Sequence, residues 1–323
     1  MNLLILSVGR RCELVDNFKK QLNQINRKVI AIDMTDLAPA LYFADKKYII
    51  KKNFNRLHGY INDVISVCKS KNVSYVLSLV DPELELLSDY KETFDKHNIT
   101  LILSDKKIIN HTQDKFKFYT TFKDTIRLAK TYNNYHDCIK ALKSGILSFP
   151  IIVKKVKGSA SIGLAKIESY ENLAFHENKS NCIFQEFIDG TEYGIDLFFD
   201  LITGKPVSVF MKEKLKMRAG ETDKALSVLS DDLLQEILKL SQFKGFRGPI
   251  DLDIFISNSG EIILNEINAR FGGGYPLAYH CGVDFIKLII NNMENKINKP
   301  EFGEYKLDQI MMKYNSFFFK EKG

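Results

Sequence analysis

Apolar runs and amphipathic stretches alternate along the first hundred residues of the chain. The runs that are continuously apolar and bounded by polar residues predict strands at residues 3–8, 28–32, 73–80 and 99–103. Apolar side chains recur at helical spacing between the first two strands, and again over residues 57–69. Pro82, in the favoured first position, opens a further helix. This alternating order predicts a parallel sheet with right-handed crossovers.

Polar residues follow these strands, at the edge of the sheet where ligands of such folds gather. They are Gly9-Arg10-Arg11, Asp33, Asp81 and Asp105. One interpretation is that polar residues simply end the strands. The other is the rim of a nucleotide fold that contacts a second substrate. A dinucleotide loop needs three glycines after the first strand, and only Gly9 is present, so we expect no NAD site.

The pattern changes after Pro150 to short strands, glycine turns and clustered charges. A polar, lysine-rich helical stretch over 110–130 links the two regions. A strand over 149–154 then ends on Lys154 and leads directly into a loop of small residues. Small residues let backbone amides approach an anion, and an ammonium group neutralises phosphate oxygens. We therefore consider a phosphate-binding loop, with a plain glycine hairpin as the alternative.

The small-residue loop contains Gly158, Ser159, Ala160, Ser161 and Gly163. The two glycines have the spacing of a Walker A loop. The Lys-Ser/Thr pair that such a loop requires is absent, because Leu-Ala follows the second glycine. The sequence therefore excludes a P-loop NTPase.

A second motif is the apolar strand that runs through Gln185, Glu186, Phe187 and Ile188 into an Asp-Gly turn. Its extended backbone could hydrogen-bond the edge of an adenine ring, and its apolar side chains could cover the face. Glu192, just beyond the turn, could accept hydrogen bonds from ribose hydroxyls. The alternative is an ordinary hairpin, because Asp-Gly is a common hairpin turn.

The third motif is the most specific. An alternating strand over 250–256 carries Asp251 and Asp253, and a turn leads to a return strand with Glu266, Asn268 and Arg270. Alternation places the last three on one face and the two aspartates together on the partner strand. Hard oxygen ligands without histidine or cysteine suit Mg²⁺. The alternative is a solvated face of an exposed hairpin. The flexible glycines Gly272, Gly273 and Gly274, which follow at once, argue against it.

The composition narrows the class of protein without indicating its chemistry. Of the 323 residues, 45% are hydrophobic and 27% charged, which excludes wholesale disorder and leaves room for about two domains. The net charge of +6 comes without a dense basic cluster, so we expect no nucleic-acid partner. We also expect no membrane contact and a cytoplasmic location, because no apolar run could span a bilayer and the N-terminus lacks a signal-peptide pattern. Five cysteines without paired spacing argue against zinc and disulfides.

Taken in order, the three motifs resemble the ATP-grasp superfamily, and within it stand-alone carboxylate–amine ligases like the large subunit of carbamoyl-phosphate synthase. The resemblance implies an α/β chain (α+β overall). A Rossmann-like pre-ATP-grasp parallel sheet over residues 1–108 would precede a two-lobed ATP-grasp fold. The small lobe would span 109–185, and the large lobe with the metal site 186–323. The proline that usually follows the metal-ligand asparagine is Ala269 in this chain.

The resemblance also implies a role for each matched residue. Two lysines, Lys115 and Lys154, would grip the ATP phosphates, and the loop with Gly158, Ser159, Ala160, Ser161 and Gly163 would cover them. The adenine hinge would be Gln185, Glu186, Phe187 and Ile188, with Glu192 on the ribose. The metal ligands would be Asp253, Glu266 and Asn268, with Asp251 as the alternative first ligand. Arg270 would stabilise negative charge during transfer. Arg218 is the preferred basic residue of the 212–222 segment for phosphate or carboxylate, with a solvated loop as the alternative.

These features together predict a ligase that joins a carboxylate to an amine or another nucleophile through an acyl phosphate, with release of ADP and phosphate. ATP and Mg²⁺, as two ions with Mn²⁺ as a substitute, would be the cofactors. The glycines 272–274 would offer amides to the acceptor carboxylate. The alternatives are a small-molecule kinase on the same fold and a non-catalytic nucleotide-binding module. The partners would be small-molecule carboxylates and amines, and the resemblance is compatible with a homodimer.

Overall fold

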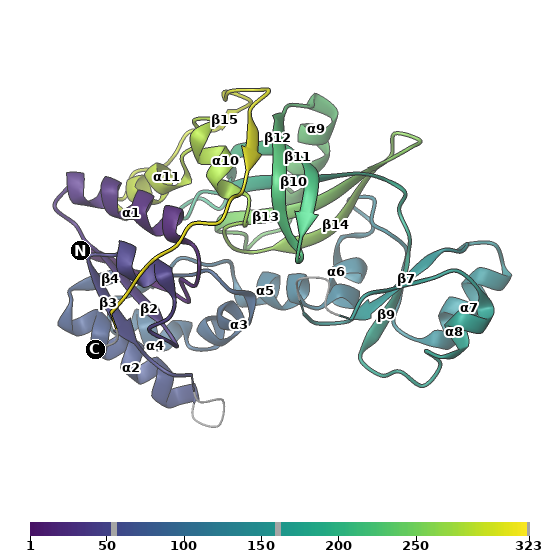
Figure 1. The fold of residues 1–323 in the computed structure, drawn as a ribbon, viewed down its shortest axis with the longest axis horizontal. Coiled ribbons are helices and arrows are strands. Elements are labelled where there is room, and N and C mark those ends of the chain that lie inside the picture. The colour runs from purple at the N-terminus through teal and green to yellow at the C-terminus, as the bar shows by residue number, and fades with distance from the viewer. Residues whose placement is uncertain (53–56, 159–162, 322–323) are drawn as a thin grey trace.

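The computed structural model describes residues 1–52, 57–158 and 163–321. Within these residues the strands form a five-stranded parallel sheet, a small four-stranded antiparallel sheet and a large seven-stranded sheet. Figure 1 shows the parallel sheet on the left, the small sheet on the right and the large sheet above the helices that connect them. The loop residues Ser159, Ala160 and Ser161 lie outside the described residues. Among those described, no helix has the length and apolar character needed to cross a membrane.

The N-terminal sheet confirms the predicted parallel α/β domain. Its strand order is β3-β2-β1-β4-β5. The strands are β1 (Asn2–Leu6), β2 (Val29–Asp33), β3 (Lys46–Ile49), β4 (Val73–Ser78) and β5 (Thr100–Leu101). The helices are α1 (Cys12–Gln24), a short 3₁₀ turn (Pro39–Phe43), α2 (Leu57–Ser70), α3 (Asp81–Asp89) and α4 (Lys91–Asp95). The hydrophobic pattern did not predict β3, because this edge strand is mostly exposed and has no continuous apolar run.

The helices α5 (Lys106–Gln113) and α6 (Lys115–Phe122) lead to the small sheet, whose order is β6-β9-β7-β8. Its strands and covering helices are β6 (Thr131–Tyr132), α7 (Tyr135–Lys143), β7 (Ile151–Lys155), β8 (Ala165–Ile167), α8 (Tyr170–Ala174) and β9 (Cys182–Glu186). Apolar side chains from both helices and the sheet, among them Leu142, Leu173 and Phe184, pack into a core of their own. The small sheet and its two covering helices are therefore packed as a separate body.

The large sheet contains the motif hairpin at one edge, in the order β14-β13-β10-β11-β12-β16, with β15 beside β11. Its strands are β10 (Gly190–Phe199), β11 (Pro206–Arg218), β12 (Glu221–Val228), β13 (Gly248–Ser257), β14 (Ile262–Asn268), β15 (Glu301–Phe302) and β16 (Ile310–Met312). Its helices are α9 (Asp231–Leu238), a 3₁₀ turn (Lys239–Gln242), α10 (Tyr275–His280) and α11 (Phe285–Met293).

The N-terminal domain and the large sheet share continuous hydrophobic cores. One core joins Leu4 of β1 and Phe122 of α6 to Leu252 of β13. A second core joins Phe18 of α1 to Phe271, and these two rings meet edge to face with centroids 5.9 Å apart. Buried apolar contact of this kind is the main favourable term in folding. It fixes the rim of the N-terminal sheet relative to the motif hairpin.

A buried carboxylate anchors α11 to the end of β10. Asp200, which has no solvent exposure, accepts hydrogen bonds from Asn292 Nδ2 at 2.7 Å and from Asn298 Nδ2 at 2.9 Å. It also accepts from the backbone amides of Ile202, Thr203 and Asn298. Burial alone would raise the pKa of Asp200, but the hydrogen bonds from Asn292, Thr203 and Asn298 outweigh it and lower that pKa.

We predict that Asp200→Asn lowers the free energy of unfolding by about 1–3 kcal/mol at pH 7, because the donors around it lose a charged acceptor. Because the pKa of Asp200 is lowered in the folded state, the wild type has its full extra stability at pH values above the ordinary carboxyl pKa of about 4. The advantage is lost as the pH falls through the folded-state pKa. Urea unfolding of both proteins from pH 7 to pH 3 measures this, and a difference that does not change with pH would contradict it.

Candidate active site

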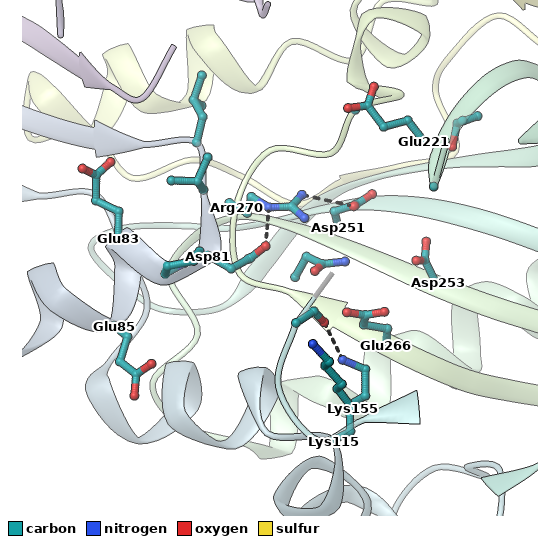
Figure 2. A pocket seen from close by; sticks show the side chains of 18 of the residues that line it. Asp81, Glu83, Glu85, Lys115, Lys155, Glu221, Asp251, Asp253, Glu266 and Arg270 are labelled. Atoms are coloured by element: carbon teal, nitrogen blue, oxygen red, sulfur yellow. Dashed lines mark hydrogen bonds and ion pairs between the residues drawn. The ribbon is translucent and has the colours of Figure 1, made fainter. Parts of the chain in front are cut away.

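Three parts of the chain meet around a cavity of about 890 Å³. The N-terminal domain contributes the end of β4 and the start of α3, the small lobe contributes lysines, and the large sheet contributes its motif hairpin. Figure 2 shows these groups pointing into the same space, among them Asp81, Lys115, Lys155, Asp253, Glu266 and Arg270. The cavity therefore combines carboxylates and cations that are far apart in the sequence.

The hairpin β13–β14 sets the carboxylates side by side. Asp253 is paired with Glu266 across the two strands, and Asp251 is paired with Asn268. The register shifts after Asp253, so Asn265 has no partner across the hairpin, and it lines the cavity together with Glu266 and Asn268. The sequence predicted simple alternation along the whole return strand. The bulge at Asn265 adds an amide oxygen that this pattern could not indicate.

Nearby positive charge only partly compensates the burial of Asp251 and Glu266 on the hairpin. Burial, together with the charge of Asp253, raises the pKa of Asp251 well above its ordinary value. Burial also raises the pKa of Glu266, and the charge of Asp253 adds to it while Lys115 and Lys154 oppose it. Oxygen donors that favour an added positive charge fit Mg²⁺. Within the described part of the chain, no group of three or more His, Cys, Asp or Glu side chains could hold a metal ion. Amide and phosphate oxygens would complete the set.

Cations face the hairpin from the small lobe. β7 places Lys154 and Lys155 at the cavity, and the start of α6 places Lys115, which donates a hydrogen bond to Gly158 O at 2.6 Å. Burial, helped by the neighbouring Lys115, lowers the pKa of Lys154 to about 8. None of these three lysines has a carboxylate within 4 Å among the residues described. They are free to neutralise an anionic ligand.

Arg270 joins the large sheet to the N-terminal domain. Its Nε donates to Asp81 Oδ2 at 3.0 Å, and its Nη1 lies 3.5 Å from Asp251 Oδ2, as Figure 2 shows. Burial opposes the charge of Arg270, but the two aspartates outweigh it and raise its pKa. Asp81, predicted at the rim of the N-terminal sheet, therefore positions Arg270, the predicted catalytic arginine. The sequence pattern did not predict this contact, because the two residues lie in distant segments.

Two further rim residues, Arg11 and Asp33, also support the cavity. Arg11 lines it and donates from Nη1 to Gly272 O at 3.1 Å. Asp33 accepts hydrogen bonds from the amides of Gly9 at 2.9 Å and Met34 at 2.7 Å, which holds the loop that carries Arg11. The rim of the N-terminal sheet is thus part of the cavity wall.

Glu83 forms a further buried group on this wall. It accepts hydrogen bonds from Tyr60 and Ser78 at 2.5 Å each, and it lies 2.7 Å from Lys52 Nζ. Its side chain is fully buried, and Lys52 and Glu83 both line the cavity. No local pattern in the sequence indicates this group, because its members come from three separate segments.

The glycine triplet is required for space. A Cβ on Gly272 would lie 2.6 Å from Asp251 Cγ, and a Cβ on Gly274 would lie 2.6 Å from Lys212 Cε. A Cβ on Gly273 would lie 3.1 Å from Arg11 Nη1. The chain therefore passes tightly over the charged groups of the sheet, and Gly273 and Gly274 line the cavity. The sequence had suggested these glycines as backbone donors, and their close packing is an additional reason for them.

Several predicted ATP-binding residues are not among the residues that line this cavity. Gln185 donates a hydrogen bond to Thr131 Oγ1 at 2.9 Å. The two carboxylate oxygens of Glu186 accept hydrogen bonds from Arg127 Nη2 at 2.9 and 3.0 Å. Phe187 lies under Lys166 Nζ, 4.5 Å from the ring centroid. Ile188 and Gly163 are also outside the lining.

Two other predicted residues lie away from the lining. Glu192 accepts from Lys214 Nζ at 2.7 Å. Arg218 is exposed at the end of β11, where it pairs with Glu221 of β12, and the structure does not bring it to the cavity wall. Lys214 lies there instead, four residues earlier on the same strand. The choice of Arg218 rested on side-chain chemistry. Simple alternation would place Arg218 on the same face as Lys214, but the register of β11 against β12 shifts twice between Lys214 and Met217, and Arg218 is exposed beyond these shifts.

Comparisons with known proteins agree with this architecture. Residues 3–102 match the model of the PylC-like N-terminal domain, and residues 112–274 match that of the ATP-grasp domain. The chain is 27% identical over 167 residues to a D-alanine–D-alanine ligase of Bacillus pumilus (45% of this chain, 46% of the relative). It is 30% identical over 146 residues to an L-arginine-specific L-amino acid ligase of Bacillus subtilis (40% and 35%). It thus spans about half or less of these relatives.

The fold resembles that of N5-carboxyaminoimidazole synthetase from Staphylococcus aureus complexed with ADP. The TM-score is 0.76 at 17% identity, over 96% of this chain and 81% of that one. The ATP-grasp match covers half of the chain and includes the lysines of the small lobe, the motif hairpin and the glycine triplet. The resemblance inferred from the three motifs is confirmed: this chain belongs to the ATP-grasp family.

Proposed function

We propose that this protein is an ATP-dependent ligase that joins a carboxylate to an amine and releases ADP and phosphate. The observation that carries the proposal is the opposition of charges across the cavity. The lysines of the small lobe that line the cavity have no carboxylate partner among the described residues. They face buried carboxylates of the hairpin, such as Glu266, whose pKa is raised by burial. A polyphosphate with a divalent cation supplies both missing charges. Family membership and the names of the relatives support the same activity.

The proposed reaction has two steps. A carboxylate oxygen attacks the γ-phosphorus of ATP, the bond to ADP breaks, and an acyl phosphate forms. The nitrogen of an amine then attacks the acyl carbon, loses a proton, and phosphate leaves. Catalysis of the first step depends mainly on positioning and charge neutralisation. This matches a cavity lined by lysine, arginine and carboxylate groups.

The residues divide this work between them. Lys115, Lys154 and Lys155 would bind phosphate oxygens, and Arg270, held by Asp81, would stabilise the negative charge of the transferring group. Mg²⁺, when bound, neutralises phosphate oxygens. Its ligands would be Asp253, Glu266 and Asn268, which lie together on the hairpin.

Further parts of the proposal rest on the family resemblance. They are the division at residues 108 and 185, the adenine hinge at Gln185–Ile188 with Glu192, the phosphate-covering loop 158–163, and Arg218. Two metal ions, substitution by Mn²⁺, a homodimer and a cytoplasmic location belong with them. Arg11 adds an observation of its own, because it lines the cavity with no carboxylate within 4 Å among the described residues. It would hold the carboxylate of a substrate.

The test is an assay of ADP and phosphate release with ATP, Mg²⁺ and pairwise combinations of amino acids, sugar acids and amines. We expect release only when both a carboxylate and an amine are present, and none from the Glu266→Gln variant. AMP and pyrophosphate as products would rule out the proposal. ADP formation with a single substrate and a stable phosphorylated product would identify a kinase instead.

The lowered pKa of Lys154 predicts a pH dependence for nucleotide binding. Its ammonium form, which attracts phosphate, is dominant below about pH 8 and is lost above it. We expect the affinity for ADP to fall above pH 8 by up to about tenfold per pH unit. Titration with a fluorescent ADP analogue from pH 6.5 to 9.5 measures this. Lys154→Met should bind weakly at every pH, and a wild-type affinity that stays constant across this range would contradict the assignment.

The close packing of the glycine triplet predicts a large effect of one methyl group. Gly272→Ala should displace Asp251, and with it Arg270, and lower kcat by about 10²-fold, as small misplacements in active sites do. Gly59→Ala is the matched control, because its Cβ would meet nothing within 4 Å on α2. It should leave kcat unchanged and raise the free energy of unfolding by up to about 1 kcal/mol. Equal kcat values for the two variants would refute the role of the triplet.

A further inference from the structure

Lys214 bridges two carboxylates that the family resemblance assigns to different ligands. Its Nζ lies 2.5 Å from Asp253 Oδ1, the first metal-ligand candidate, and 2.7 Å from Glu192 Oε1, the ribose candidate. The lysine side chain is only 5% exposed, yet it lines the cavity. An internal ammonium group therefore stands at the point where cation and nucleotide would meet.

A gap in the sheet makes this bridge possible. Gly194 of β10 is paired with Lys212 on one side and with Asp253 on the other. A Cβ at this glycine would lie 3.0 Å from Lys212 Cε and 3.2 Å from Lys214 Cε. Because Gly194 has no side chain, Lys214 can extend from β11 across β10 to reach Asp253 on β13. The bridge is thus built into three neighbouring strands.

Lys212, two residues before Lys214 on β11, forms a buried ion pair that does not reach the cavity. Lys212 extends over the same glycine and lies 2.5 Å from Asp196, and both side chains are almost completely buried. Gly274 passes directly over Lys212, which does not line the cavity. Lys214 differs in that the cavity reaches it and that its two partners are 20% and 25% exposed. Its partners can therefore be exchanged for a ligand.

The electrostatic consequence is competition. Two carboxylates, Asp253 and Glu192, lie within 2.7 Å of the Lys214 ammonium group and hold it in place. A divalent cation at Asp253 would lie beside this like charge, which repels it strongly at short range. A polyphosphate that arrives with the cation offers the displaced ammonium a new anionic partner. Such charge-assisted contacts are among the strong hydrogen bonds of proteins.

We propose that Lys214 is an internal cation that competes with a divalent cation for the carboxylates of Asp253 and Glu192, and that binding of the divalent cation therefore depends on the nucleotide. The inference rests on the nucleotide and metal sites of the proposed function. It adds that the free metal ion is excluded and that cation and nucleotide enter together. When they do, Lys214 leaves Asp253 and Glu192 for the phosphates.

The test is a titration with Mn²⁺ in the absence of nucleotide, with free Mn²⁺ measured by electron paramagnetic resonance. Lys214→Met keeps the length of the side chain and removes the charge, and we expect it to bind Mn²⁺ at least about tenfold more tightly than the wild type. Lys214→Arg keeps the charge and should bind as weakly as the wild type. Lys155→Met is the matched control, because it removes a cavity lysine that contacts no carboxylate within 4 Å in the described chain. This variant should bind Mn²⁺ no more tightly than the wild type does.

Two results would overturn the inference. One is a Lys214→Met variant whose affinity for Mn²⁺ is no higher than that of the wild type. The other is a Lys155→Met variant whose affinity for Mn²⁺ rises as much as that of Lys214→Met. Thermal unfolding gives an independent reading, because Mn²⁺ alone should raise the Tm of Lys214→Met and not that of the wild type. If that variant does not fold, Lys214→Gln takes its place under the same criteria. Binding of a fluorescent ADP analogue with Mg²⁺ tests the nucleotide site separately. Its failure would count against the proposed function, while the Mn²⁺ comparison still decides the role of Lys214.

Discussion

The arrangement of this molecule depends on the neutralisation of carboxylates that the large sheet buries side by side. Asp196 and Asp251 face each other across β10 and β13, and Asp253 and Glu266 face each other across β13 and β14. Like charges directly opposite each other on neighbouring strands destabilise a sheet unless cations compensate them. The cations come from two lysines of β11, from the arginine after β14 and from the small lobe. Elements distant in the sequence are therefore held to one geometry by charge balance as well as by hydrophobic contact.

Packing divides these charges between two bodies. The N-terminal domain and the large sheet share hydrophobic cores, so Asp81 and Arg270 are fixed relative to each other across 189 positions of the sequence. The small sheet has its own core, so Lys154 and Lys155 of β7 approach the hairpin from a separately packed unit. Lys115 lies on α6, which packs into the shared core. A body with its own core can shift relative to its neighbour at low cost, because few buried contacts cross the boundary. The carboxylates of the cavity therefore belong to the part of the molecule with shared cores, whereas Lys154 and Lys155 belong to a unit with a core of its own.

Local patterns predicted much of this molecule, and contacts between distant segments account for most of what they did not predict. The parallel sheet and the motif hairpin follow from hydrophobic periodicity, and cross-strand pairing does place Asp253 opposite Glu266. The bulge at Asn265 breaks that periodicity, because a bulge depends on the local fit of two strands. The same limit applies to the basic segment of β11, where Arg218 points to solvent and Lys214 to the cavity. Its reach across β10 depends on a glycine twenty residues away, which no pattern within β11 contains.

Charge balance within the cavity also restricts what can enter it. A lone divalent cation would meet ammonium and guanidinium groups that already occupy the carboxylates. A lone polyphosphate would meet the carboxylates of Asp251 and Glu266, whose pKa values are raised by burial and by the charge of Asp253. A complex that carries both signs replaces each internal partner with an external one, so the number of unpaired buried charges does not rise. Because Lys154 and Lys155 lie on the separately packed small sheet, such a complex neutralises charges on both packed units at once and stabilises them against each other.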